Sequence, residues 1–369
     1  MYKSLRAQTL KYWARPHAAI PTTPIDSPAA WRGEQMRGRE DLWVSRLSAA
    51  EIEELHAGQR HAAASGKPAR EMSAADFPLP TLSARIAQWR NEIRRGKGFV
   101  LIRGVPVGQW TEQQAETFFW CLGHHFGIPG AQNPEGDLLG HVRDQRTGED
   151  VRYYRTNKEL AVHTDTADFV GLLCLQKAKS GGLSRIASSV AVFNELMRVK
   201  PQLVPLLFEP LYFDTKGEGG VRAFPIPPCR YFNGELRTFW QSDYYRTVNR
   251  FDHVPPMTPE LKDLLDTYDG IANSPAFHLD MDLQPGDVQL ISNHTILHAR
   301  TGFEDWPELE RRRHLLRLWI SIPEPMPLVE RLRTMQSFAS VVGTAAVELL
   351  RERARGYKGG ALGSMGAGR

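Results

Sequence analysis

The stretch His163-Thr164-Asp165, taken together with the distant His298, is the most informative part of this chain. In an extended segment successive side chains alternate between two faces, so His163 and Asp165 point the same way and can bind one metal ion. Two histidines and one carboxylate form the facial triad of mononuclear iron oxygenases, which leaves positions for a co-substrate and O2. Because short histidine–aspartate pairs are common by chance, the assignment depends on the surrounding sequence.

The composition of the segment before His298 is what we expect where a metal ligand lies at the edge of a sheet. Residues 284–287 have the composition of a tight turn, and residues 288–291 that of a strand leading toward His298. His294 and His298 are four residues apart, a spacing that could form a zinc pair on a helix, but no glutamate follows His294. We therefore exclude a zincin-type peptidase site.

A basic and apolar segment after His298 supplies candidates for an anion-binding arginine. Residues 311–321 predict a strand on which Arg313 and Arg317 share one face. If this strand pairs with the strand of His298, it carries an arginine toward the metal, where a planar guanidinium can bind a carboxylate through two hydrogen bonds. A solvated basic surface is the alternative, and it does not explain Arg317 within an apolar strand.

These motifs resemble those of the TauD/TfdA-like taurine/2-oxoglutarate dioxygenases, which are Fe(II)- and 2-oxoglutarate-dependent oxygenases. The resemblance extends from about Phe99 to Pro323 and implies a mixed α and β fold, with a double-stranded β-helix (jelly-roll) core and flanking helices. Short strands mixed with helices agree with that fold without specifying it. The matching motifs are His163-Thr164-Asp165, Gly181-Gly182-Leu183-Ser184, the segment from Asn293 to Arg300, and the arginine-rich strand.

The resemblance also implies which residues bind the metal and the co-substrate. Ser184, the hydroxyl residue after the paired glycines, would contact the 2-oxoglutarate carboxylate near the metal. The arginine that anchors the far carboxylate aligns with Arg317, with Arg313 as a supporting or substitute partner. Asp165 argues against a halogenase, in which a small residue replaces the carboxylate ligand. The implied Fe(II) ligands are His163, Asp165 and His298.

The implied reaction uses Fe(II), 2-oxoglutarate and O2. Oxidative decarboxylation of 2-oxoglutarate to succinate and CO2 is coupled to hydroxylation of a substrate C–H bond, or to desaturation or cyclisation. We expect a small substrate that is anionic or amino-acid-like. Two alternatives stay open: a metal-dependent enzyme of the cupin or hydrolase type that does not use 2-oxoglutarate, and a catalytically silent binding protein that keeps the fold.

Residues that select the substrate are less clearly marked. The segment from Tyr231 to Arg250 interleaves aromatic and arginine side chains, which could form a wall for a small anion. Core aromatics beside solvated arginines are an equally good interpretation. Asn157 lies shortly before the metal motif, in the region that contacts the primary substrate in relatives. Our substrate candidates are Asn157, Tyr245 and Arg246.

Composition agrees with a globular enzyme. The chain has 369 residues, of which 41% are hydrophobic and 24% charged, and its net charge of +4 is too small to indicate nucleic acid or a membrane surface as the main partner. The first 20 residues lack the apolar stretch of a secretory signal, and no run of about 18 apolar residues predicts a membrane span. We expect a cytoplasmic protein with buried thiols, because the cysteines are odd in number and widely spaced: Cys121, Cys174 and Cys229.

The chain is expected to form one catalytic domain. Residues 1–30 predict an N-terminal arm rich in proline, and residues 31–325 the catalytic domain with helical insertions. Residues 326–357 predict a C-terminal helix, and residues 358–369 a flexible tail of small residues. The C-terminal helix could mediate a homo-oligomer or pack on its own domain.

Local patterns mark several further elements. Residues 48–51 form a capping box that predicts a helix through about Ala57, and Thr111 is the expected N-cap of a helix that ends with His124 and His125. Adjacent helix residues diverge, so we expect capping or surface roles for these two histidines and no chelating pair. Helices are expected over residues 82–94, 111–126, 190–207 and 259–268, and strands over residues 98–104 and 170–176.

Overall fold

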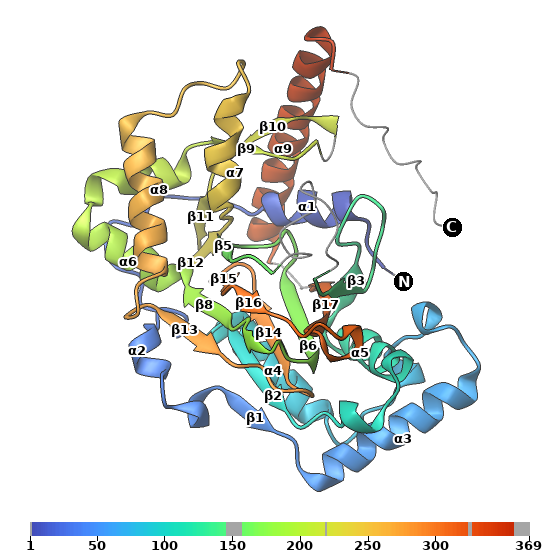
Figure 1. Ribbon diagram of the computed structural model, residues 1–369. Coiled ribbons are helices and arrows are strands. Elements are labelled where there is room, and N and C mark those ends of the chain that lie inside the picture. The colour runs from blue at the N-terminus through green and yellow to red at the C-terminus, as the bar shows by residue number, and fades with distance from the viewer. Residues whose placement is uncertain (1, 145–156, 218–219, 324–326, 358–369) are drawn as a thin grey trace.

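Two β-sheets form the centre of the molecule in the computed structural model, which describes residues 2–144, 157–217, 220–323 and 327–357 (Figure 1). The larger sheet has the order β1 (Val44–Arg46), β2 (Phe99–Arg103), β14 (Val288–Ser292), β6 (Phe169–Gln176), β17 (His314–Ser321) and β3 (Ile128–Gly130), and β4 (Gly140–Val142) also pairs with β17. The smaller sheet has the order β13 (His278–Met281), β8 (Ser184–Ser188), β15 (Ile296–Arg300) and β5 (Leu160–His163). This arrangement confirms the expected jelly-roll core.

Three short hairpin-like sheets and a set of helices surround this core (Figure 1). The two-stranded sheets pair β9 (Leu211–Asp214) with β10 (Ala223–Ile226), β11 (Cys229–Phe232) with β12 (Glu235–Thr238), and β7 (Ser180–Gly181) with β16 (Phe303–Glu304). The helices of the described residues are α1 (Leu5–Trp13), α2 (Gly33–Met36), α3 (Ala49–Ser65), α4 (Ser83–Arg95), α5 (Glu112–Phe126), α6 (Ser189–Val199), α7 (Ser242–Thr247), α8 (Pro259–Ala272) and α9 (Leu328–Ala354).

The two faces of β17 pack into different parts of the core. Leu316, Leu318 and Ile320 belong to a buried cluster that includes the apolar side chains of α5. Leu315 and Trp319 belong to a second cluster, together with residues of β8 and β15 in the smaller sheet. Because side chains alternate along a strand, Arg317 lies on the same face as Leu315 and Trp319, between the two sheets.

Strand β17, which contains Arg317, pairs with other strands than we expected. β17 pairs with β6, β3 and β4 in the larger sheet, whereas β15 with His298 pairs with β5 and β8 in the smaller one. The expected pairing of the two strands is therefore wrong. Both β17 and β6 are apolar on both faces, which suits central strands covered on each side. Arg317 consequently approaches the metal motif from the facing sheet.

Most of the expected helices and strands are present. The capping box is confirmed, since Ser48 Oγ accepts from Glu51 N and the Glu51 carboxylate accepts from Ser48 N. Helix α3 continues past the expected end to Ser65 and stops at Gly66, which adopts a φ of 65°. The helical segment expected over residues 190–207 is present but divided in two. Helix α6 ends at Val199, because Pro201 disfavours helical geometry at the residue before it, and a 3-10 helix follows.

Both ends of the described chain contain helices that pack on the rest. Within the segment expected to be an arm, α1 buries Gln8 and Tyr12, and the Tyr12 hydroxyl donates to the backbone oxygen of Asn293 at 2.6 Å. The expected C-terminal helix is confirmed as α9, which contacts α1. The predicted tail, residues 358–369, lies outside the described residues.

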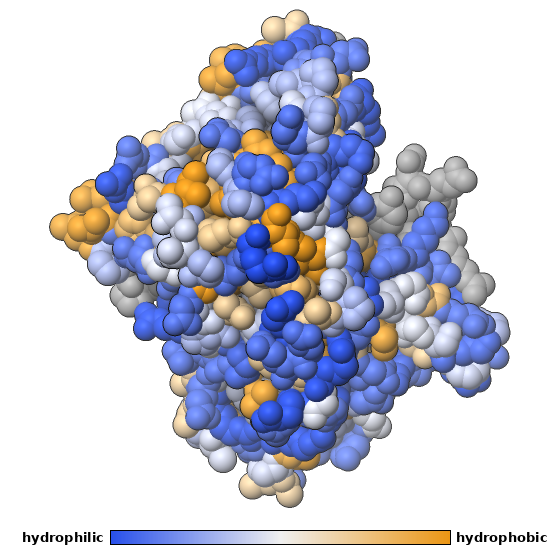
Figure 2. Space-filling view, turned by 90° about the vertical axis from the view of Figure 1, so that its left-hand side faces the viewer, coloured by the Kyte–Doolittle hydropathy of each residue, from blue (hydrophilic) through white to orange (hydrophobic). Residues whose placement is uncertain are grey.

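The surface and the cysteines agree with the composition. On the face that carries α6 and α8, apolar residues form small groups among hydrophilic ones (Figure 2). No helix within the described ranges is long and apolar enough to cross a membrane. The expectation of buried free thiols is confirmed for Cys121, Cys174 and Cys229.

Candidate metal centre and co-substrate site

The structure brings the three predicted metal ligands together between paired strands of the smaller sheet. His163 ends β5 and lies directly opposite His298 on β15, with ring centroids 4.1 Å apart. Asp165 follows two residues after His163, and its Oδ1 lies 3.9 Å from His163 Nε2 while its Oδ2 lies 3.7 Å from His298 Nε2. One donor atom from each of the three side chains therefore falls within 4.8 Å of the others.

Hydrogen bonds hold the Asp165 carboxylate in this position. Trp319 Nε1 on β17 donates to Asp165 Oδ2 at 2.8 Å, and the Asn293 side-chain oxygen accepts from Asp165 N at 3.0 Å. Thr164 turns away, as expected, and its Oγ accepts from Trp240 N at 3.0 Å. Trp319 thus orients the carboxylate from the larger sheet, Asn293 holds the backbone of the same residue, and Oδ1 is left for a ligand.

The protonation states of these side chains suit a divalent metal. Burial, reinforced by the neighbouring His298, lowers the pKa of His163 to about 4, so its ring is neutral at pH 7. Its Nδ1 lies 2.9 Å from the backbone oxygen of Ala161, so the proton belongs on Nδ1 and the lone pair on Nε2. Burial alone would raise the pKa of Asp165, but the hydrogen bond with His298 and the charge of Arg317 outweigh it and hold that pKa below its usual range. A neutral imidazole and an ionised carboxylate are the forms that bind metal.

The paired glycines make room for a buried arginine. Gly182 has a φ of +69°, and a Cβ there would lie 3.0 Å from the Nε atom of Arg313. Arg313 is 5% exposed, its Nη2 lies 3.5 Å from the backbone oxygen of Gly182, and its Nη1 has no hydrogen-bond partner among the described residues. Burial lowers the pKa of Arg313 to about 10. A buried guanidinium with an unused donor fits a carboxylate ligand.

Ser184 lies close to this arginine and to the metal motif. It begins β8, two residues after Gly182, and is opposite Arg300, which is two residues from His298 on β15. Its buried Oγ donates to the Gln289 side-chain oxygen at 2.8 Å. Ser184 thus lies on the strand next to that of His298, and Gly182, two residues before it, contacts Arg313.

Arg317 is held by a different set of contacts. Its Nε donates to the Gln132 side-chain oxygen at 2.7 Å, and Gln132 in turn donates to the Arg317 backbone oxygen at 2.7 Å. The guanidinium lies 5.5 Å from the Trp319 ring, and its charge lowers the pKa of both His163 and Asp165. Arg317 is thus close to the metal ligands themselves.

The three substrate candidates lie in different environments. Tyr245 is a core residue, 2% exposed, whose hydroxyl donates to the Phe239 backbone oxygen at 3.1 Å. Arg246 forms ion pairs of 2.9 Å with both Asp266 and Asp269 of α8. Asn157 is exposed, and its backbone oxygen accepts from Phe303 N. The structure does not bring these three side chains together.

Sequence reasoning missed three residues that position the site. Trp319 could have been found from strand alternation, since it follows Arg317 by two positions. Gln132 and Asn293 had no local signal for their contacts, because each bonds to a residue more than 120 positions away. His125 Nε2 lies 2.9 Å from the Phe77 backbone oxygen, and the His124 ring packs edge-on against Trp120.

Together, the jelly-roll core and its two-histidine, one-aspartate triad define a non-haem iron oxygenase. The family model described as "Taurine catabolism dioxygenase TauD, TfdA family" matches residues 64–319, and the chain belongs to this family. It is a 2-oxoglutarate-dependent dioxygenase that uses Fe(II), 2-oxoglutarate and O2. The alternatives without 2-oxoglutarate are thereby set aside.

Curated relatives and solved structures agree with this assignment. The FR-33289 synthase of Streptomyces rubellomurinus is 29% identical over 310 residues, covering 81% of this chain and 91% of that protein. The taurine hydroxylase-like protein SAT17 of Stachybotrys chartarum is 27% identical over 312 residues, covering 80% and 79%.

Two solved structures share the fold. The first is an asparagine oxygenase in complex with Fe(II), 2S,3S-3-hydroxyasparagine and succinate. It has a TM-score of 0.62 at 20% identity, covering 76% of this chain and 93% of that one. The second is the non-haem iron oxygenase OrfP in complex with Fe and α-ketoglutaric acid, with a TM-score of 0.58 at 17% identity, covering 76% and 94%.

Proposed function

We propose that this dioxygenase hydroxylates, desaturates or cyclises a small anionic or amino-acid-like molecule at a centre formed by His163, Asp165 and His298. The observation that carries the proposal is the convergence of these side chains, with an ionised aspartate held by Trp319. When bound, Fe(II) and 2-oxoglutarate supply the O2-dependent oxidation of a C–H bond, with succinate and CO2 as co-products. The protein orients the reactants and excludes water.

Arg313 is the better candidate for the far carboxylate of 2-oxoglutarate. Alignment of the sequence favours Arg317, but the contacts favour Arg313, whose buried guanidinium has an unused donor beside the Gly181-Gly182 turn. Ser184 lies at the same end of the site, as expected for a residue that contacts the co-substrate. An anion there would offset the cost of burying the Arg313 charge.

We assign Arg317 to an anionic group of the substrate, because its guanidinium lies beside the metal ligands. The bound hydroxyasparagine of the asparagine oxygenase and the hydroxy-L-Arg of an OrfP complex support an amino-acid-like substrate. Asn157 is the candidate for direct contact. Tyr245 and Arg246 would influence the substrate site indirectly. Tyr245 packs against Trp240 with 5.4 Å between ring centroids, and Trp240 N donates to Thr164 of the metal motif.

Anaerobic binding of Fe(II) and 2-oxoglutarate tests the centre. We expect a visible metal-to-ligand charge-transfer band in the wild type and none in His163→Ala. His61→Ala, an exposed histidine of α3, is the matched control and should keep the band. A screen of small anionic amino acids for coupled succinate formation would then identify the substrate. A band of equal intensity in His163→Ala would contradict the ligand assignment.

The same band separates the roles of the two arginines without any substrate. Losing a charged hydrogen-bond donor costs about 1.5–3 kcal/mol, so Arg313→Met should raise the 2-oxoglutarate concentration for half-maximal binding by about 10–100-fold. Arg317→Met should leave it nearly unchanged and weaken substrate binding instead. The reverse pattern would return the far-carboxylate role to Arg317.

We also propose a cytoplasmic enzyme that self-associates through α9. Buried free thiols suit a reducing compartment. A second copy is the occupant that would cover the exposed apolar side chains of this long helix, and light scattering of the wild type against Leu332→Glu tests it. Those side chains are Leu328, Val329, Leu332, Met335, Phe338, Val342, Val347 and Leu350.

A further inference from the structure

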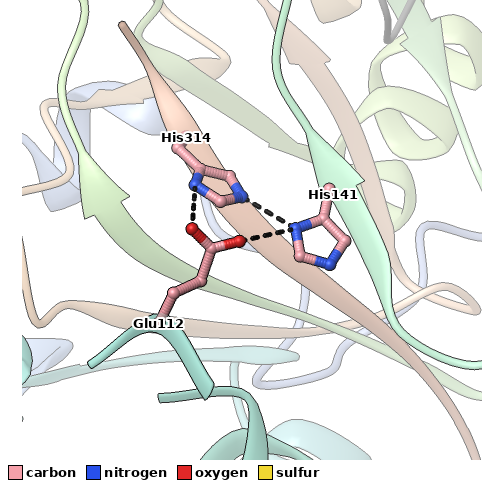
Figure 3. A group of neighbouring side chains, drawn as sticks. All are labelled: Glu112, His141 and His314. Carbon is pink, nitrogen blue, oxygen red and sulfur yellow. Dashed lines mark hydrogen bonds and ion pairs between the residues drawn. The ribbon is translucent and has the colours of Figure 1, made fainter. Parts of the chain in front are cut away.

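A second group of metal-binding side chains lies on the opposite side of the larger sheet. Glu112 begins α5, His141 lies on β4, and His314 begins β17, so three separate elements contribute one residue each (Figure 3). The two histidines lie on paired strands, where His141 is opposite Leu316. Glu112 faces both rings from the first turn of the helix (Figure 3). The iron triad contributes no residue to this group.

The spacing of the donor atoms suits a small divalent ion. His141 Nδ1 lies 2.9 Å from His314 Nε2 and 3.6 Å from Glu112 Oε1, and His314 Nδ1 lies 3.9 Å from Glu112 Oε2. In tetrahedral zinc sites the metal–donor distance is about 2.0–2.1 Å, which places neighbouring donors about 3.3 Å apart. These contacts use both nitrogens of His314, and one donor atom from each of the three side chains lies within 4.8 Å of the others. Side-chain rotations that direct one nitrogen of each ring and one Glu112 oxygen to a common point would enclose an ion.

The protonation and exposure of these side chains allow a cation to bind. A second carboxylate, Glu116 on the next turn of α5, lies 3.7 Å from His141 Nε2, the ring nitrogen that does not face Glu112, so it is a neighbour of the group and not one of its ligands. Burial lowers the pKa of His314 to about 4, so this ring is neutral and has a lone pair at pH 7. Arg143 is the neighbouring positive charge that acts on His314. The Glu112 side chain is half exposed, which leaves an ion access from solvent.

We propose that Glu112, His141 and His314 bind a divalent cation of the zinc type, with positions left for water, at a site separate from the iron centre. Imidazole and carboxylate ligands in this number are typical of Zn²⁺. The ion would join the start of α5 to β4 and β17. Strand β17 carries Arg317 and Trp319 on its other face. The ion would therefore stabilise the strand that contributes these two residues to the iron site.

Metal titration in a chain without the iron ligands tests the site. The double variant His163→Ala/His298→Ala removes binding at the triad, so Zn²⁺ measured by calorimetry reports the second site. We expect one equivalent of Zn²⁺, an increase of Tm on its addition, and a Co²⁺ derivative with the intense visible absorption of tetrahedral cobalt. None of these readouts requires catalytic activity, so they are independent of the proposed function.

Further variants in the same background identify the ligands. His314→Gln and the solvent-accessible Glu112→Gln should each weaken Zn²⁺ binding by at least about tenfold. His61→Gln, an exposed histidine of α3, should bind Zn²⁺ as the background chain does, and circular dichroism checks that every variant is folded. The proposal is overturned if the triad-free chain binds no Zn²⁺, or if folded Glu112→Gln and His314→Gln bind it with unchanged affinity.

Discussion

At the scale of single residues, the contact between Trp319 and Asp165 links β17 of the larger sheet to the candidate metal site. The indole N–H donates to Asp165 Oδ2 at 2.8 Å, and the ring is buried. Trp319→Phe keeps an aromatic ring but removes this donor, so the carboxylate loses its orientation. We expect Fe(II) affinity to fall by about 10–100-fold, as is usual for residues that orient a ligand, measured by anaerobic Fe(II) titration.

Trp306→Phe is the control for this prediction, since Trp306 stacks on Arg311 at 3.6 Å and lies on a loop outside the triad. It should bind Fe(II) as the wild type does. If a folded Trp319→Phe protein also keeps full affinity, the hydrogen bond has no role in holding the metal ligand.

At the scale of elements, the turn from β7 to β8 contacts Arg313, the residue that we propose to bind 2-oxoglutarate. Gly182 combines a φ of +69° with a close approach to Arg313. Gly182→Ala would strain the turn and push the guanidinium away, because an added Cβ needs space that Arg313 Nε and Cδ occupy at 3.0 and 3.2 Å. We expect a lower Tm together with weaker 2-oxoglutarate binding, measured through the charge-transfer band.

Gly270→Ala is the matched substitution, because Gly270 lies within α8 with open space around it. It should leave 2-oxoglutarate binding unchanged and stabilise the protein by up to about 1 kcal/mol. Equal 2-oxoglutarate binding in wild type and Gly182→Ala would show that the turn does not position Arg313.

At the scale of the whole molecule, the N-terminal segment contacts the loop that follows Asp165, although this segment precedes residues 64–319, which the family model matches. Asp168, three residues after the candidate metal ligand Asp165, is buried, forms ion pairs with Arg15 and with Lys11 at 2.6 Å, and hydrogen-bonds with His294 at 2.9 Å. The charges of Arg15 and Lys11 and the hydrogen bond to His294 hold the pKa of Asp168 well below its usual range, although burial alone would raise it. Lys11 and Arg15, which precede the matched residues 64–319, thus hold the loop that follows Asp165.

Arg15→Met tests this support. It leaves a buried carboxylate with one cation fewer, so we expect a loss of about 2–4 kcal/mol in the free energy of unfolding and weaker Fe(II) binding. Denaturant melts and Fe(II) titration measure the two effects. Arg6→Met, on the exposed side of α1, should change neither. An unchanged free energy of unfolding in Arg15→Met would show that the Arg15–Asp168 ion pair does not stabilise the loop that follows Asp165.

Several parts of the site could be predicted from the sequence, because the patterns that indicate them lie within a few consecutive residues. His163 and Asp165 are two positions apart, Gly181 and Gly182 mark a turn with positive φ, and Ser48 and Glu51 form a capping box. Each depends on the backbone geometry of a few consecutive residues. For the same reason the chemistry class followed from a short motif and a resemblance. Residue patterns did not identify the strand that pairs with β17, since apolar alternation specifies which face is buried and not which neighbour buries it.

The sequence therefore established the metal ligands as candidates, the family resemblance and most helices, all of which are encoded in neighbouring residues. Long-range packing decided the remaining features of the site. Pairing of β17 with β6 places Arg317 and Trp319 across from the triad, and the glycine turn leaves Arg313 buried with an unused donor. Such contacts join positions more than 100 residues apart, and their energies depend on burial and distance, which exist only once the sheets have packed.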